Sequence, residues 1–135
     1  MVCPDVVADR AGTLARWKEW HPDLKEWGWP VAIAVQDGMV PSDVPPEADV
    51  VFVGGSTRWK RNTLQTWCKE FPRVHVARVN SYAFLWICAE FGVESVDGTG
   101  WWHRNARQLY GLEKFCREWD EGHRVNPQEP LRLFT

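Results

Sequence analysis

The chain has 135 residues, of which 44% are hydrophobic and 25% are charged, and its formal net charge is −2. This length and composition predict a single globular domain over residues 1–135 and exclude both a disordered chain and a strongly basic nucleic-acid binder. No apolar run is long enough to cross a membrane, and the four cysteines form no CxxC pair. We therefore expect a reduced, cytoplasmic protein with no metal, no cofactor and no membrane contact. Ten tryptophans are a surplus, which indicates that some line a pocket or an interface.

Short β-type runs alternate with helical segments along the whole chain. Within residues 1–7 we expect a strand that leads into a loop at Pro4-Asp5. Further strands are expected over 31–35, 50–53, 74–79 and 93–96, and helices over 10–20, 58–71, 82–91 and 104–120. The first helix is capped by Asp9 and stopped by His21-Pro22, with room for one more turn before Gly28. The proline-rich residues 39–49 form a loop, and residues 126–135 form a surface tail. Alternating strands and helices predict a parallel α/β sheet, and five strands instead of eight predict an open sheet or part of a barrel.

Polar or glycine residues follow the strands. They are Asp5, Gln36 with Asp37, Gly54 with Gly55, Asn80 with Ser81, and Asp97. Because the carboxyl ends of parallel strands share one rim, we expect these residues to lie close together. Carboxylates, an amide and a bare glycine backbone suit a flat polar ligand such as a purine.

Two interpretations of these strand ends stay open. Asp97 lies where a strand gives way to a loop, the place where α/β proteins carry their chemistry, and it is either a nucleophile or a turn residue. The pair Asp97-Gly98 is a common turn signal, and so is Gln36-Asp37-Gly38. The tight passage from strand to helix is a sufficient reason for Gly54-Gly55. His75 and His103 are interpreted as ordinary surface or core histidines.

Basic residues begin the helix over 58–71. Arg58, Lys60 and Arg61 fall in its first turn, where the helix dipole favours anions over cations. Such a misfit is tolerated more readily where an external anion binds, although a solvated helix start accounts for the same residues.

Four blocks of the sequence resemble the tRNA-guanine transglycosylase superfamily. They are V-F-V-G-G-S-T-R-W-K (51–60), V-H-V-A-R-V-N-S (74–81), S-V-D-G-T (95–99) and R-N-A-R (104–107). The first is close to the G-G-S-T-x-W-K form of phage and bacterial relatives proposed to act on DNA. More weakly, P-D-V-V-A-D (4–9) and A-V-Q-D-G (34–38) resemble the strands that give the family its base-recognition aspartate and glutamine. The resemblance implies the last five strands of a TIM-type (β/α)8 barrel.

The resemblance also implies a reaction, the exchange of guanine for a 7-deazaguanine base in nucleic acid, with DNA favoured over tRNA. Asp97 then corresponds to the nucleophile that attacks C1′ of the nucleotide, and a carboxylate suits such an oxocarbenium-like centre. The residues matched to the base are Asp5, Gln36, Gly54 and Gly55. Arg104 and Arg107 are matched to phosphate contacts, and Trp101 and Trp102 are placed to stack on an extruded nucleotide. Arg58, Lys60 and Arg61 are further candidates for local contact with the nucleic acid.

The sequence departs from the family in three ways. It has no D-S-G-G-F-type motif, which carries the family's general acid/base, and it lacks the downstream Cys/His zinc site and the first barrel strands. The chain is therefore a minimal enzyme with an open sheet, a split half that needs a homo-oligomer or a partner chain to complete the barrel, or an inactive module that binds nucleic acid or a purine base. An oligomeric structural protein with tryptophans at its interface is a further alternative.

Overall fold

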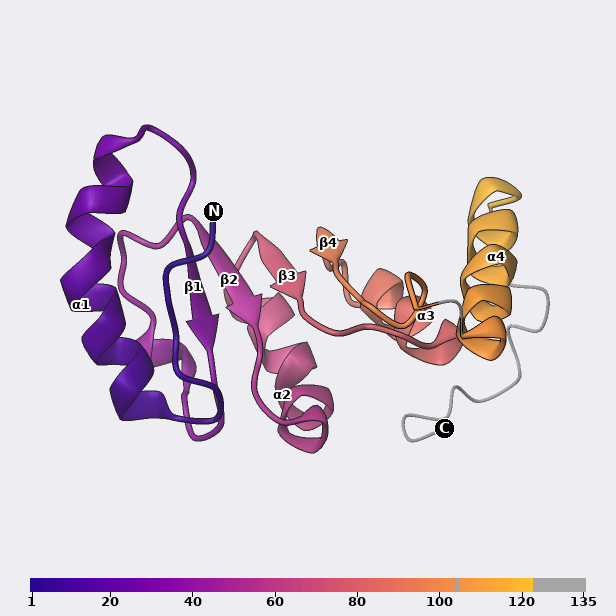
Figure 1. The fold of residues 1–135 in the computed structure, drawn as a ribbon, viewed down its shortest axis with the longest axis horizontal. Coiled ribbons are helices and arrows are strands. Elements are labelled where there is room, and N and C mark those ends of the chain that lie inside the picture. The colour runs from indigo at the N-terminus through magenta and orange to yellow at the C-terminus, as the bar shows by residue number, and fades with distance from the viewer. Residues whose placement is uncertain (104, 123–135) are drawn as a thin grey trace.

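The computed structural model describes residues 1–103 and 105–122, and its central feature is one open sheet of four parallel strands (Figure 1). The elements follow as α1 (Arg10–Glu26), β1 (Ala32–Val35), the short 3-10 helix η1 (Pro41–Asp43), β2 (Val50–Val53), α2 (Thr57–Glu70), β3 (Val74–Val76), α3 (Tyr82–Glu90), β4 (Ser95–Val96) and α4 (Ala106–Asp120). The strands lie side by side in chain order, and every neighbouring pair is parallel. The predicted α/β class with parallel strands in an open sheet is confirmed.

The strand expected at the start of residues 1–7 does not form. This segment pairs with β1 only through a single parallel bridge between Val2 and Ala32. It then leaves the sheet, because Thr13 of α1 holds the backbone of Val6 through bonds of 3.0 Å to both its N–H and its carbonyl. The described sheet therefore has four strands instead of the expected five.

The first helix runs further than predicted, through Pro22 to Glu26. Proline in a helix interior removes one backbone hydrogen bond, so the sequence favours a stop there. Tertiary packing overrides this preference: Trp17 and Leu24 are buried on either side of Pro22, and Trp17 stacks on His21 with ring centroids 4.3 Å apart. The other helix starts agree with capping chemistry, since Ser56, Ser81 and Asn105 each accept a hydrogen bond from the amide three residues on.

The two faces of the sheet differ. Ile33, Val51, Val53 and Val76 point to one face and belong to the buried core, together with apolar side chains of α1, α2 and α3. Residues of the opposite parity, including Phe52 and His75, are only partly buried. Even there, β1 is fully buried, as the continuous apolar run suggested. The sheet thus has one face covered by helices and one face that is open from β2 to β4.

Helix α4 packs against α3 and lies at the end of the molecule opposite to α1 (Figure 1). The buried carboxylate of Glu118 joins the two helices, because it accepts hydrogen bonds from Tyr82 Oη at 2.6 Å and from Trp86 Nε1 at 3.0 Å. The predicted tail over 126–135 and Arg104 lie outside the described residues. Within the described ranges, no helix combines the length and apolarity that a membrane span requires.

Candidate functional site

A pocket of about 270 Å³ opens at the carboxyl ends of the strands, and we call it the strand-end pocket. All five residues matched to catalysis and base binding line it. The full lining is Asp5, Val7, Gln36, Phe52, Gly54, Gly55, Ala77, Arg78 and Asp97. The volume lies just below the ~300–1,000 Å³ of sites for drug-sized ligands, so it suits a single flat heterocycle better than a whole nucleotide.

Gln36 is the fixed part of this pocket. Its side chain is only 2% exposed, its Nε2 donates to Asp5 Oδ2 at 2.5 Å, and its Oε1 accepts from the amide of Ala8 at 3.0 Å. The backbone of Ala8 takes a left-handed conformation, with φ of 57°, to make that contact. Both ends of the amide are thereby oriented, and Asp5 is held as an acceptor at the pocket wall.

The two glycines form a wall that no other residue fits. A Cβ atom on Gly54 would stand 2.7 Å from Gln36 Nε2, and one on Gly55 would stand 2.6 Å from Asp37 Oδ1. Gly55 also has a φ of +73°, which favours glycine. Asp37 itself turns away from the pocket to bind the amide and hydroxyl of Ser56, both at 2.6 Å. Glycine is therefore required here so that Gln36, Asp37 and Trp59 can pack against the backbone, and both glycines present that backbone at the pocket wall.

Asp97 is held from both sides by the neighbouring strand. His75 Nε2 lies 2.9 Å from its Oδ2, and the amide of Arg78 donates to its Oδ1 at 3.0 Å. Partial burial by itself raises the pKa of Asp97, but the hydrogen bonds from His75 and Arg78 and the charges of His75 and Lys60 outweigh it. The net effect is a pKa below the usual range, so Asp97 is a carboxylate at neutral pH, with 47% of its side chain exposed.

Arg78 was missed by sequence reasoning. It falls inside the predicted strand over 74–79, but β3 ends at Val76 and Arg78 adopts a left-handed backbone with φ of 56°. Its guanidinium donates to the carbonyl of Gly55, so one residue bridges the ends of β2 and β4. A non-glycine residue in this conformation costs energy and is often found at functional sites. The only sign in the sequence that Arg78 belongs to the site is its position two residues before Asn80-Ser81, the polar pair expected at the strand end.

The basic residues of α2 divide into buried and exposed ones. Arg58 is exposed, whereas Lys60 is 0% exposed and donates to the carbonyl of Ala77 underneath the strand-end pocket. Burial, followed by repulsion from Arg78, lowers the pKa of Lys60 to about 8. Arg61 lies over the ring of Phe84, 4.8 Å from its centroid, and burial lowers its pKa. The structure thus corrects the expectation that Lys60 contacts nucleic acid, because its charge does not reach the surface.

The two tryptophans after Asp97 are also placed differently from one another. Trp101 is tied down, since its Nε1 donates to Val79 O at 3.2 Å and to Asn80 Oδ1 at 3.3 Å. Trp102 is 86% exposed. Trp102 is therefore the one available to stack on an external ring, while Trp101 fixes the loop that carries it.

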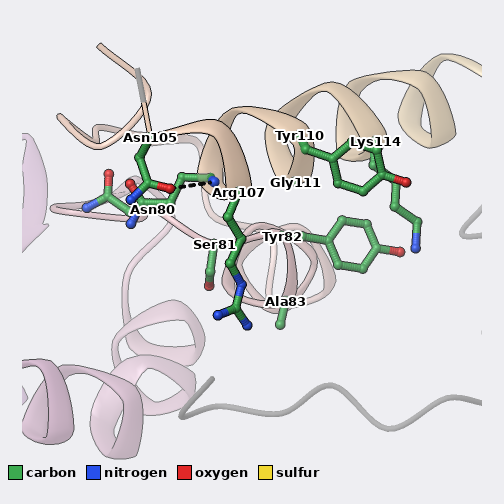
Figure 2. Close-up of a pocket in the computed structure, with 10 residues that line it drawn as sticks. Asn80, Ser81, Tyr82, Ala83, Asn105, Arg107, Tyr110, Gly111 and Lys114 are labelled. Atoms are coloured by element: carbon green, nitrogen blue, oxygen red, sulfur yellow. Dashed lines mark hydrogen bonds between the residues drawn. The ribbon is translucent and has the colours of Figure 1, made fainter. Parts of the chain in front are cut away.

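A second pocket, of about 450 Å³, lies between the starts of α3 and α4, and we call it the helix-pair pocket (Figure 2). Its two cationic side chains are Arg107 and Lys114, and Lys114 Nζ sits 4.4 Å from the ring centroid of Tyr82. No carboxylate is among its lining residues, which are Asn80, Ser81, Tyr82, Ala83, Asn105, Arg107, Gln108, Tyr110, Gly111 and Lys114. Of the two arginines predicted to contact phosphates, Arg107 lines this pocket.

The open face of the sheet carries a third, shallow hollow of about 460 Å³, the open-face hollow. It shares Phe52 and Asp97 with the strand-end pocket and extends from there past His75 to Arg73, Glu94 and Ser95. Within the part of the chain that the structure describes, no group of His, Cys, Asp and Glu is arranged to hold a metal ion, and all four cysteines are free thiols.

Comparison with known proteins adds no relative: no family model, no curated protein and no solved structure matches this chain.

Proposed function

We propose that this chain is a transglycosylase-like protein that exchanges guanine for a 7-deazaguanine base in nucleic acid, with DNA favoured over tRNA, in the cytoplasm. The observation that carries the proposal is the strand-end pocket. Asp5, Gln36, Gly54, Gly55 and Asp97 were matched to the family from the sequence, and all five line this one pocket of base-sized volume. The motif G-G-S-T-R-W-K, similar to the phage-type form, is the reason to favour DNA.

In this reaction the base edge is read by Asp5 and Gln36, and the sugar is attacked by Asp97. A carboxylate oxygen of Asp97 forms a bond to C1′ while the C1′–N9 bond breaks, and the departing guanine takes a proton from water. A nitrogen of the incoming base then attacks C1′, the bond electrons return to Asp97, and the incoming base loses a proton. Two displacements at one carbon retain its configuration. The lowered pKa of Asp97 favours this role, because a nucleophile must be ionised.

The helix-pair pocket supports a path for the nucleic-acid backbone. Arg107 supplies positive charge, Lys114 supplies an ammonium that also lies 3.9 Å from Glu118 Oε1, and the backbone amides at the starts of α3 and α4 supply further donors. Val79 joins this pocket to Asp97, since its amide bonds to Asp97 O at 2.6 Å and Asn80 follows in the pocket lining. Trp102 and Arg58 add an exposed aromatic ring and an exposed charge outside the two pockets.

A partner chain that supplies the other half of the barrel is part of the proposal. The four parallel strands follow in sequence without the reversal of order seen in doubly wound sheets, as successive strands of a barrel do. Phe52 and His75 lie on the open face, which becomes the interior when a barrel closes. The family's D-S-G-G-F motif is missing here, so a partner that carries it would take over the proton transfers that water makes for this chain alone. A second copy of this chain would close a barrel without bringing that motif.

A binding module is the second candidate, and the contacts of Gln36 favour it. The contacts with Asp5 and Ala8 fix this amide and still leave one N–H and one oxygen lone pair to read a base, so the pocket is a preformed receptor. Such a receptor binds a base or an extruded nucleotide without reacting.

The deciding experiment is to trap the covalent intermediate. The purified chain is incubated with single-stranded DNA, duplex DNA or tRNA, then denatured and resolved by electrophoresis. We expect a denaturation-resistant adduct that is lost in Asp97→Asn and retained in Asp23→Asn, a matched change at an exposed aspartate of α1. Equal adduct in Asp97→Asn would refute Asp97 as the nucleophile. Tight binding with no adduct, unaffected by Asp97→Asn but weakened by Arg107→Ala, identifies the module. Sedimentation of the same sample shows whether an active species is a monomer or a homo-oligomer.

A further inference from the structure

A hydrogen-bonded chain of three side chains runs along the open face of the sheet next to the strand-end pocket. His75 of β3 lies between two residues at β4, with Nδ1 2.8 Å from Ser95 Oγ and Nε2 2.9 Å from Asp97 Oδ2. Its ring stacks on Phe52 of β2, with centroids 4.8 Å apart and an angle of 14° between the planes. The imidazole, 21% exposed, is therefore fixed at both nitrogens and on one face.

The chemistry of the two contacts fixes where the protons are. Asp97 is ionised, and a carboxylate oxygen accepts only, so the proton of His75 must be on Nε2. Ser95 is different, because a hydroxyl both donates and accepts. It donates to Nδ1 when His75 is neutral and accepts from Nδ1 when His75 is an imidazolium. His75 can thus gain or lose a proton without breaking either hydrogen bond.

We propose that His75 is the positioning residue of Asp97, and that protonation of His75 through the Ser95–His75–Asp97 chain sets the lifetime of the covalent glycosyl–Asp97 intermediate. The second part rests on the proposed function. His75 does not line the strand-end pocket, so it acts through Asp97 and does not touch the base.

The direction of the effect follows from the charge on Asp97. When Asp97 attacks C1′, its carboxylate becomes a neutral ester, and an adjacent imidazolium stabilises the free carboxylate more than the ester. Protonated His75 therefore slows the attack. It speeds the second displacement, in which the C1′–O bond breaks and its electrons return to Asp97. Histidine is the side chain whose charge changes near neutral pH. Raising the pH should lengthen the life of the adduct.

Other charged groups near His75 leave this switch in place. Arg73 and Glu94, which precede β3 and β4, line the same hollow but bind each other through paired contacts of 2.9 and 2.8 Å. The amino terminus of Met1 also lines it and donates to Pro30 O at 2.6 Å. From the covered face, Lys60 acts on Asp97.

Two variants test the proposal. His75→Gln keeps a side-chain amide that can donate to Asp97 but cannot change charge, and His75→Phe keeps a ring against Phe52 but makes neither hydrogen bond. Titration of the Asp97 carboxyl by ¹³C NMR needs no activity. We expect His75→Phe to raise the pKa of Asp97 and His75→Gln to raise it less. If the pKa of the Asp97 carboxyl is the same in a folded His75→Phe variant as in the wild type, the positioning role is overturned. If His75→Phe does not fold, the same comparison is made with His75→Gln.

The pH dependence of the adduct tests the switch. The wild-type adduct should decay more slowly as the pH rises, while the His75→Gln adduct should decay at a rate that does not follow pH. The same pH profile in both proteins overturns control by His75. No adduct in the wild type at any pH overturns the proposed function and with it the control of lifetime, whereas the carboxyl titration still decides the positioning role. Labelling of Ser95 by a fluorophosphonate would overturn both parts, because Ser95 would then be the nucleophile of the chain.

Discussion

Replacing Lys60 by methionine should stabilise the protein at neutral pH and remove a pH dependence at alkaline pH. Lys60 is fully buried beneath the strand-end pocket, with its ammonium bonded to the carbonyl of Ala77 and 5.5 Å from the ring centroid of Phe84. Burial and the charge of Arg78 lower its pKa from 10.5 to about 8. Folding thus takes a charged group out of water and gives it an uncharged carbonyl, that of Ala77, as its hydrogen-bond acceptor, which is an unfavourable arrangement.

The magnitude follows from the shift in pKa. A difference of about 2.5 between 10.5 and 8 corresponds to ~3 kcal/mol, at 1.36 kcal/mol per unit. The folded pKa lies below the unfolded one, so this cost is fully present below pH 8 and disappears as the pH rises from 8 to 10.5. Methionine removes the cost but leaves Ala77 O without its donor, a loss of ~1–2 kcal/mol. The net expectation is a gain of roughly 1–2 kcal/mol at pH 7.

Urea unfolding at several pH values between 7 and 10.5 measures this directly. The wild type should gain stability across that window relative to Lys60→Met, and the two curves should cross within it, because the loss of the donor to Ala77 O remains after the desolvation cost has gone. Lys69→Met is the matched control, because Lys69 is an exposed lysine of the same helix and its replacement should leave the pH dependence unchanged. If stability depends on pH in the same way in the wild type and in Lys60→Met, the pKa of Lys60 is not lowered by burial and the reasoning fails.

Three further changes test the scaffold. Gly54→Ala should destabilise the folded protein by roughly 1–3 kcal/mol, because the new Cβ would stand 2.7 Å from Gln36 Nε2. Most of this cost should vanish when Gln36 is also replaced by alanine, which urea unfolding of the two single variants and the double variant measures. Glu118→Ala should cost ~2–4 kcal/mol in the same assay, because Tyr82 Oη and Trp86 Nε1 lose their buried acceptor. Pro22→Ala should raise stability by about 1–2 kcal/mol, seen as a higher thermal midpoint, since it restores a donor inside α1.

The order and type of the elements could be predicted from the sequence, while several boundaries could not. The apolar periods that place β1, β2, α2 and α3 are local, and local pattern is what a sequence displays. The predicted boundaries are wrong where a contact with a residue distant in the sequence determines where an element ends. Helix α1 continues past Pro22 because Trp17 and Leu24 hold it against the core, and β3 stops early because Arg78 turns its amide towards Asp97.

The candidate site divides in the same way. Five strand-end residues could be grouped from the sequence because parallel strands bring their carboxyl ends to one rim. The grouping failed for Asn80 and Ser81, which line the helix-pair pocket, and for Asp37, which binds Ser56. The partners of Asp97 could not be predicted from the sequence, because His75 lies next to Asp97 only in the strand register that pairs His75 with Ser95. The alternating pattern did hold a signal, since His75 and Asp97 have the same parity in that register and therefore face the same side of the sheet. Without a known register, the same pattern fits an ordinary surface histidine.

The contacts of Asp97 narrow the choice that its sequence position left open. A turn aspartate bonds to backbone groups about two residues further along its own loop. Asp97 instead uses both carboxylate oxygens on the preceding strand unit, at His75 and at the amide of Arg78. A side chain in that position is either a strap between β3 and β4 or a positioned nucleophile, and Asp97→Asn separates the two. If Asp97 only links the two strands, Asp97→Asn lowers the stability of the fold and has no other effect. Because the pKa of Asp97 is lowered on folding, the stability that its carboxylate gives the wild type is lost as the pH falls through that pKa. A nucleophile loses the adduct in Asp97→Asn even at temperatures where the variant is fully folded. An adduct formed by the wild type but absent from folded Asp97→Asn is therefore the result that a strap alone cannot produce.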